Sequence, residues 1–285
     1  MTAHLTPTSR IAAVNVATVP QRSLLRYPGG KTWLVPHVRH WLTGGCDLLV
    51  EPFAGGGIVS LTAVMEGLSE RALMVDLDRD VAAFWRAALM HGEDLADRIM
   101  AFEATWDGVS KLEVTPPVTV LDHGFRTLVL NRTRRGGVLA PGAALTRNGE
   151  NGNGVASRWS PDTLAIRLRA IGEYADRITF CEGDGEAMLA VTANIPRVRI
   201  FVDPPYTAGG KRAGSRLYAH NTVDHGRIFG VLAESSADLL MTYDGCDEVL
   251  AFVDEHGFHA VTVEMRNGHN RRAMELVITR DRLFA

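Results

Sequence analysis

The stretch that decides the fold is DLLVEPFAGGG, at residues 47–57. Its first part, Asp47–Val50, is a short apolar run that is typical of a buried strand. A glycine-rich turn follows at Ala54–Gly57, and apolar residues then recur at helical spacing as far as Gly67. Glycines between a strand and a helix let backbone amides and the helix N-terminus approach a ligand closely. The stretch therefore predicts a β-α unit that binds a ligand, and the alternative is a purely structural tight turn.

The alternation of strand and helix continues on both sides of a central interruption. Short apolar runs predict further strands at Ala72–Val75, Arg177–Phe180, Arg199–Val202 and Asp238–Tyr243. From His259 onward, apolar and polar residues alternate, a turn follows at Asn267–Asn270, and the alternation then resumes. We therefore expect an α/β fold with a mainly parallel, Rossmann-like sheet and a C-terminal antiparallel hairpin.

The interruption covers residues 93–159 and includes a glycine- and asparagine-rich stretch at 148–154. This composition favours turns, so we expect a partly helical insertion with a long mobile loop. A helix is predicted to begin after it, with Ser160 as the N-cap and Pro161 at the first helical position. We therefore expect one domain formed by residues 23–92 and 160–285, an insertion over 93–159, and a flexible leader over 1–22.

The charge is distributed unevenly along the chain. The formal net charge is −3, but Arg126 to Arg169 holds eight arginines and two acidic residues, a local charge of +6. Such asymmetry indicates a polyanion partner for this segment. The alternative is that arginine simply replaces lysine, since the chain has only Lys31, Lys111 and Lys211.

Cysteine usage and hydropathy bear on the compartment and on metal binding. Cys46, Cys181 and Cys246 are far apart and form no Cys-x-x-Cys pair, so we expect neither a metal site nor disulfides. No apolar run approaches the length of a membrane span. A reducing cytoplasm is the expected compartment.

The strongest chemical signal is Asp203-Pro-Pro-Tyr206, directly after a predicted strand. Two prolines make a stiff bend and remove two backbone donors, which fixes the carboxylate and the carbonyls around a small pocket. Tyr206 adds a flat face, so the pocket suits an amino group on a planar ring. The alternative is a purely structural Pro-Pro turn.

A second polar signal is Asp76, at the end of the strand predicted at Ala72–Val75. An acidic residue at this place commonly accepts hydrogen bonds from ribose hydroxyls. The alternative is that Asp76 caps the next helix, and Asp78 and Asp80 compete for either role.

Together these blocks resemble the adenine-specific DNA methyltransferases of the DNA adenine methylase family. Phe53-x-Gly55-x-Gly57 and the later Asp203–Tyr206 motif carry the resemblance. Several other segments are similar to blocks of that family, namely Tyr27-x-Gly-Gly-Lys31, Val75–Asp78, Gly183-Asp184, Leu130–Thr133 and Leu217-Tyr218. There are two departures, Arg134–Gly137 where relatives carry aromatic-Asn-Gly, and Gly185 where an aromatic residue is frequent.

The resemblance implies site-specific methylation of the exocyclic amine of adenine in double-stranded DNA, with S-adenosylmethionine as cofactor and with base flipping. It implies the catalytic residues Asp203, Pro204, Pro205 and Tyr206. The implied cofactor-binding residues are Tyr27, Gly30, Lys31, Glu51, Pro52, Phe53, Ala54, Gly55, Asp76, Asp184 and Asp203. The implied DNA-binding residues are Asn131, Arg132, Arg134, Arg135, Arg158, Lys211 and Arg212.

Other readings of the same blocks stay open at this point. RNA adenine methylation and protein glutamine methylation use related chemistry, although glutamine methyltransferases usually begin the Pro-Pro-Tyr motif with asparagine. Cytosine-amine methyltransferases usually begin it with serine. A catalytically silent DNA-binding relative is the alternative from another class. A restriction endonuclease partner is compatible with the resemblance, and the sequence leaves the recognition site and the oligomeric state open.

Overall fold

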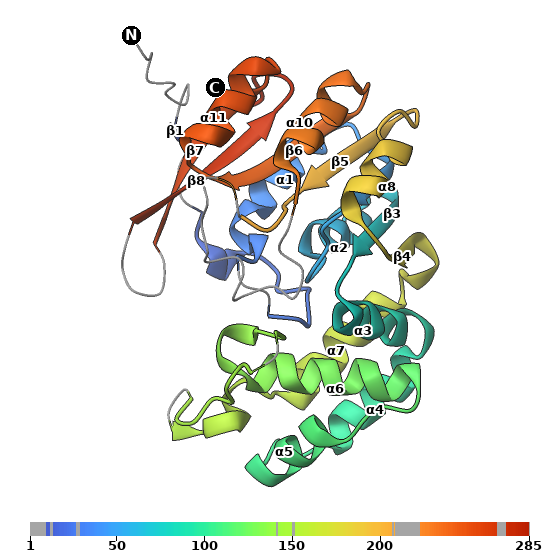
Figure 1. The fold of residues 1–285 in the computed structure, drawn as a ribbon. Coiled ribbons are helices and arrows are strands. Elements are labelled where there is room, and N and C mark those ends of the chain that lie inside the picture. The colour runs from blue at the N-terminus through green and yellow to red at the C-terminus, as the bar shows by residue number, and fades with distance from the viewer. Residues whose placement is uncertain are drawn as a thin grey trace.

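The computed structural model describes residues 10–11, 14–26, 29–140, 142–149, 152–206, 208, 223–266 and 272–284. Its centre is an eight-stranded sheet in the order β1-β7-β8-β6-β5-β2-β3-β4 (Figure 1). The strands are β1 Arg10–Ile11, β2 Cys46–Glu51, β3 Ser69–Asp76, β4 Ile178–Glu182, β5 Val198–Val202, β6 Asp238–Asp244, β7 His259–Arg266 and β8 Arg272–Thr279.

Most neighbouring strands are parallel, and the exceptions lie at the C-terminal end of the chain. Strand β8 runs antiparallel to both β6 and β7, so β7 and β8 form the expected hairpin. The predicted mainly parallel α/β fold with an antiparallel C-terminal hairpin is confirmed.

Ten α-helices accompany the sheet in the described part of the chain. They are α1 Val35–Trp41, α2 Ile58–Met65, α3 Arg79–Met90, α4 Gly92–Ala101, α5 Trp106–Val114, α6 Val120–Thr133, α7 Pro161–Gly172, α8 Gly185–Thr192, α10 His225–Glu234 and α11 Asp247–Glu255. A short 3-10 helix, η2 Lys31–Leu34, leads into α1. None of the described helices has both the length and the apolar character needed to cross a lipid bilayer.

The central strands are buried on both faces, as the alternation of their side chains shows. Leu49 and Phe201 belong to the core cluster that includes α1 and α2. Their strand neighbours Val50, Ile200 and Val202 belong to the cluster that includes α8, α10 and α11. Helices therefore cover both faces of the parallel sheet, which is why these strands read as continuous apolar runs.

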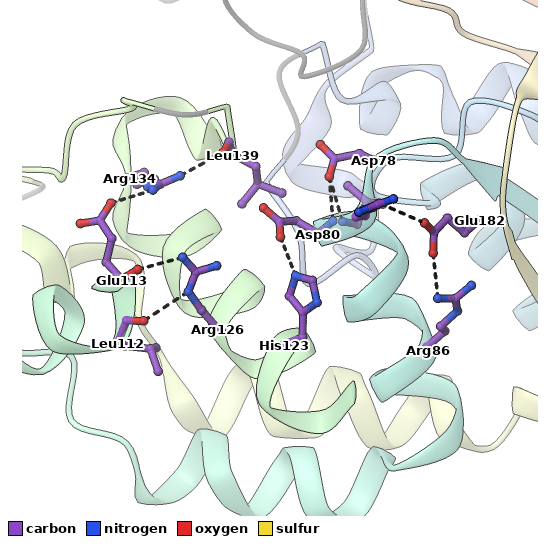
Figure 2. Close-up of polar contacts among 12 residues, drawn as sticks. Asp78, Asp80, Arg86, Leu112, Glu113, His123, Arg126, Arg134, Leu139 and Glu182 are labelled. Atoms are coloured by element: carbon purple, nitrogen blue, oxygen red, sulfur yellow. Dashed lines mark hydrogen bonds and ion pairs between the residues drawn. The ribbon is translucent and has the colours of Figure 1, made fainter. Parts of the chain in front are cut away.

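The segment expected to be a partly helical insertion contains α4, α5 and α6, which gather with α7 beyond α3 (Figure 1). Helix α6 crosses α3 closely, since a Cβ at Gly124 would lie 2.4 Å from the Cβ of Ala87. At the same crossing, His123 Nε2 lies 2.6 Å from the Asp80 carboxylate (Figure 2). That residues 93–159 form a separate insertion with these boundaries stays a prediction.

Two local expectations differ in part from the structure. Val19 is buried in the core and Arg22 lies 2.6 Å from Glu66, so these two residues of the expected flexible leader contact the rest of the molecule, while the leader over residues 1–22 as a whole stays a prediction. Ser160 occupies the N-cap position of α7, but its side chain makes no capping hydrogen bond there. Pro161 stands at the first turn as predicted.

Candidate active site at the carboxyl ends of the strands

A cavity of about 410 Å³ lies where the central parallel strands β2, β3 and β5 end. The glycine turn after β2, residues 53–57, lines it together with Asp76 from the end of β3 and Asp203 after β5. This volume is in the range of small-molecule sites, and the carboxyl ends of parallel strands are where open α/β sheets bind ligands. The two segments that carry the sequence resemblance thus face a single cavity.

The glycine turn is held in place from below by Asp76 and Trp85. The backbone N–H of Gly55 donates to Asp76 Oδ2 at 2.8 Å, and Trp85 Nε1 donates to the Gly55 carbonyl at 2.9 Å. Gly57 has φ +63°, and a Cβ there would lie 2.7 Å from the Met74 side chain, so both space and conformation require glycine. The turn therefore presents a fixed backbone to the cavity.

The competition among the three aspartates after β3 is resolved by their hydrogen bonds. Asp78, and not Asp76, caps α3, because its carboxylate accepts from the backbone N–H groups of Asp80 and Val81. Asp80 instead contacts His123 on α6. Asp76 accepts from the backbone of Gly55 and Asp78 and also lines the cavity.

Glu51, the last residue of β2, is a buried carboxyl at the floor of the cavity. It accepts hydrogen bonds from the Ser60 backbone N–H at 2.9 Å and from the Ser60 hydroxyl at 2.5 Å. Burial outweighs these bonds and raises the pKa of Glu51 to about 8, with Asp203 and Asp76 adding to the rise. Glu51 is therefore mainly uncharged at neutral pH.

Asp184 and Gly185 complete the rim at the start of α8. Asp184 is the N-cap of α8 and accepts from the backbone N–H of Glu186 at 2.8 Å. A Cβ at Gly185 would lie 2.3 Å from the Pro52 carbonyl oxygen and 2.9 Å from the Phe53 ring. An aromatic residue, frequent here among the relatives, has no room, because the glycine turn approaches α8 too closely.

The Asp203 carboxylate is gripped by three donors. Lys31 Nζ lies 2.8 Å from Asp203 Oδ2, and the hydroxyls of Tyr206 and Thr242 each donate to Oδ1 at 2.8 Å. Lys31 is almost completely buried and also lies 3.2 Å from Glu275 on β8. The motif around Lys31 and the motif around Asp203 are thereby joined into one charged cluster.

The four residues of the Asp203–Tyr206 bend differ in whether their side chains line the cavity. Asp203 and Pro205 line the cavity, while Pro204 is buried. The Tyr206 ring stacks on Tyr243 at 6.0 Å between centroids, and Lys31 Nζ lies 5.1 Å from the ring centre. Tyr206 therefore packs behind the carboxylate, and this conformation does not present the flat stacking surface that we expected.

Two of the predicted DNA-binding residues are interior. Asn131 is fully buried, and its amide bonds to the backbone of Arg26 and to the Gly137 carbonyl. Arg134 is buried and pairs with Glu113 at 2.6 Å (Figure 2). Asn131 thus joins α6 to the backbone of Arg26, and Arg134 joins the end of α6 to α5, while a contact of either residue with DNA stays a prediction.

The other predicted contacts differ in their exposure. Arg135 is exposed, and Arg158 is half-buried. Arg132 lines the cavity, where burial and the nearby Arg26, Arg167 and Arg158 lower its pKa to about 10. Tyr27, Lys211 and Arg212 lie outside the described residues.

Two residues near the site, Thr242 and Glu275, were not singled out from the sequence. Arg26 and Arg167 line the cavity, while Thr242 and Glu275 contact the Asp203 cluster. The regular alternation of Met274, Leu276 and Ile278 predicts that Glu275 points away from their side of β8. The pattern does not indicate that the opposite face of β8, where Glu275 lies, is also in contact with other residues such as Lys31.

Comparison with known proteins gives a match at the level of a family. Residues 27–109 match the family model of the D12 class N6 adenine-specific DNA methyltransferases. No curated protein matches the sequence. The rRNA methyltransferase aviRa from Streptomyces viridochromogenes is similar in structure, with 14% identity, 94% of this chain and 96% of that chain covered, and a TM-score of 0.46.

An rRNA methylase from Streptococcus thermophilus is also similar, with 10% identity, 86% of this chain and 95% of that chain covered, and a TM-score of 0.37. The family match includes Lys31, the glycine turn and Asp76, and it implies S-adenosylmethionine as the cofactor. The chain is thus an S-adenosylmethionine-dependent methyltransferase whose residues 27–109 resemble the D12 class N6 adenine-specific DNA methyltransferases.

Proposed function

We propose that this methyltransferase transfers a methyl group to the exocyclic amine of adenine in DNA. The observation that carries the proposal is the shared cavity, in which the Asp203 carboxylate stands beside the glycine turn and Asp76. The family match over residues 27–109 supports adenine as the target, since that family is described by this specificity.

The residues around the cavity fit S-adenosylmethionine. The glycine turn offers backbone groups without Cβ atoms, and the carboxylates of Asp76 and Asp184 are acceptors for hydroxyl and amino groups. Lys31 and Glu51 also line the cavity, and Lys31 contacts Asp203 there. When bound, the cofactor supplies an electrophilic methyl group on a sulfonium, so the protein's task is alignment and electrostatics.

Asp203 has the free acceptor capacity that such a reaction needs. A carboxylate oxygen has two lone pairs, and Oδ1 uses both for the hydroxyls of Tyr206 and Thr242. Among the contacts of the described residues, Oδ2 uses one for Lys31, and its other lone pair remains as an acceptor position at the cavity. That position would accept a hydrogen of the adenine amine and draw its lone pair out of conjugation with the ring.

The Pro204 carbonyl is the proposed acceptor for the second amine hydrogen. The nitrogen would then attack the methyl group directly, in line with the bond to the departing sulfur, and no covalent intermediate with the enzyme is needed. Asp203 would take the proton that the amine loses. In this mechanism the protein would orient and desolvate the base, and it would not need to activate the methyl donor.

A paired adenine cannot reach a cavity of this depth, so we propose that the base leaves the duplex. Basic side chains at Arg132, Arg135 and Arg158 would bind phosphates around it, with Arg132 nearest the cavity. Because such contacts release counterions, DNA affinity should fall steeply with salt. While it packs on Tyr243 and donates to Asp203, Tyr206 would not stack on the base.

The test is transfer of a tritiated methyl group from S-adenosylmethionine to polymers of defined composition. We expect labelling of duplex DNA of mixed sequence, no labelling of duplex DNA made of G·C pairs alone, and label released as N6-methyladenine after digestion. Labelling of RNA alone, or of cytosine, would contradict the proposal. D203A provides the control, because it should bind S-adenosylmethionine in calorimetry while losing transfer.

A further inference from the structure

Five polar side chains, Asp203 included, form one connected group of contacts next to the cavity. One of the five has no role in the reaction outlined above. That residue is Glu275 on β8, which reaches Lys31 at 3.2 Å and the Tyr206 hydroxyl at 2.7 Å. Thr242 from β6 completes the group. Glu275 thus contacts two of the three donors that hold Asp203, and it does not line the cavity itself.

The polar contacts in this group outnumber the hydrogens that its donor groups can supply for hydrogen bonds. Lys31 Nζ contacts the Gly29 carbonyl at 2.6 Å, Asp203 Oδ2 at 2.8 Å and Glu275 Oε1 at 3.2 Å. The Tyr206 hydroxyl contacts two carboxylates, at 2.8 Å and 2.7 Å, and the Thr242 hydroxyl contacts one at 2.8 Å. An ammonium has three hydrogens and a hydroxyl has one, so these six contacts lack one hydrogen.

The shortage is sharpest at Tyr206, whose single hydrogen cannot serve Asp203 and Glu275 at once. If both carboxyls were ionised, one of the two short oxygen–oxygen contacts would join two acceptors, which is repulsive. A proton on either carboxyl removes the conflict, because that carboxyl then donates to the Tyr206 oxygen. The geometry therefore requires that one of the two acids is protonated.

The surroundings place this proton on Glu275. Its side chain is 13% exposed against 22% for Asp203, and Lys31 lies closer to Asp203 than to Glu275. Thr242 donates to Asp203, whereas Asp244 on β6 stands directly opposite Glu275 in the strand register. Burial raises the pKa of Glu275 and Asp203 adds to the rise, while Lys31 opposes it.

We propose that Glu275 is a positioning residue that works in its protonated form, donating to the Tyr206 hydroxyl so that Tyr206 donates to Asp203. The chain from Glu275 through Tyr206 fixes the direction of the Tyr206 hydrogen. Among the contacts of the described residues, Oδ2 of Asp203 then keeps one lone pair for a donor in the cavity. The effect of Glu275 on methyl transfer rests on the proposed function, whereas its protonation does not.

Two substitutions separate a protonated Glu275 from an ionised one. Lys31 and the Tyr206 hydroxyl both contact Oε1 of Glu275. In E275Q an amide nitrogen at this position keeps the donor for Tyr206 and gives up the acceptor for Lys31, so it imitates the protonated acid toward Tyr206. E275L keeps the volume but removes both. We expect E275L to lower kcat about tenfold to a hundredfold, in the range seen when a group that orients an active residue is lost, and E275Q to recover part of this loss by restoring the donor to Tyr206.

The pH dependence of kcat provides a second test, because a purely structural role of Glu275 would not change it. In the wild type, kcat should fall as pH rises through the raised pKa of Glu275, because the ionised acid no longer donates to Tyr206. E275Q should lack this alkaline fall. An E275Q variant as inactive as E275L, with both folded by circular dichroism, would overturn the inference, as would a fully active E275L.

Protonation can also be measured without any activity. A protonated carboxyl has a carbonyl stretch in the infrared that an ionised one lacks, and the difference between wild type and E275Q should contain this band. E51Q is the matched control, since Glu51 should contribute a separate band. An unchanged spectrum in E275Q would defeat the inference. If instead the wild type fails to methylate DNA, the proposed function fails while the infrared result still stands.

Discussion

The ammonium of Lys31 lies 2.8 Å from the Asp203 carboxylate, although one residue precedes the first central strand and the other follows β5. Lys31 belongs to the short helix that leads into α1, on one face of the sheet. Asp203 stands at the carboxyl end of the strand beside β2. Lys31 belongs to residues 27–109, the segment matched by the family model, and Asp203 lies outside that segment. The ion pair therefore connects the two parts of the site.

Replacing Lys31 by methionine tests this link. The change keeps the apolar part of the side chain, removes the cation from Asp203 and Glu275, and leaves two carboxyls without it. We expect unfolding free energy to fall by about 3 kcal/mol, as when one partner of a buried pair is removed, and methyl transfer to be lost. Urea unfolding measures the first, and a transfer assay the second. K111M is the control, because Lys111 is exposed on α5. Wild-type stability in K31M would contradict the expectation.

Replacing Gly185 by alanine tests the close contact between α8 and the glycine turn. The new Cβ would lie 2.3 Å from the Pro52 carbonyl oxygen, so the turn or the helix must move. We expect a loss of about 1–3 kcal/mol, typical of overpacking, and weaker binding of S-adenosylmethionine in calorimetry. G172A is the matched control, since a Cβ there meets nothing within 4 Å. Equal behaviour of the two variants would show that the contact does not constrain the site.

The sequence predicts the scaffold of this site well because short-range rules govern it. Apolar runs locate β2, β3, β5 and β6, and glycine and proline mark the turns at their ends. Since parallel strands end at one edge of a sheet, the order of strands and helices along the chain is enough to place Asp76 and Asp203 near the glycine turn.

The parts that the sequence did not predict depend on contacts between distant segments. Asn131 looks like a polar helix residue, and only the crossing of Arg26 over α6 makes it interior. Glu275 looks like a solvent-facing position in an alternating strand, and only the packing of Lys31 covers it. Tyr206 is oriented by Tyr243 and Glu275, which lie far along the chain.

The raised pKa of Glu51 predicts a pH dependence of stability. An acid whose pKa rises on folding, here from 4.5 to about 8, binds more protons in the native state than in the unfolded state between these values. Stability should therefore fall as pH rises from about 4.5 to about 8 and change little from this source beyond. E51Q removes the titration, so its unfolding free energy should decline less than that of the wild type across this window, as urea unfolding can measure. Parallel pH profiles for the two proteins would contradict the assignment.

The two neighbouring positions Asn131 and Arg135 should separate stability from DNA binding. N131A leaves the backbone of Arg26 and the Gly137 carbonyl without their partner, so we expect a loss of about 2 kcal/mol in stability. R135A removes an exposed cation and should leave stability within about 0.5 kcal/mol, while lowering DNA affinity and reducing the salt slope by about one. Fluorescence anisotropy with duplex DNA at several salt concentrations measures the slope. A normal slope in R135A would remove Arg135 from the DNA-binding surface, whereas an altered slope in a folded N131A would show that Asn131 acts on DNA after all.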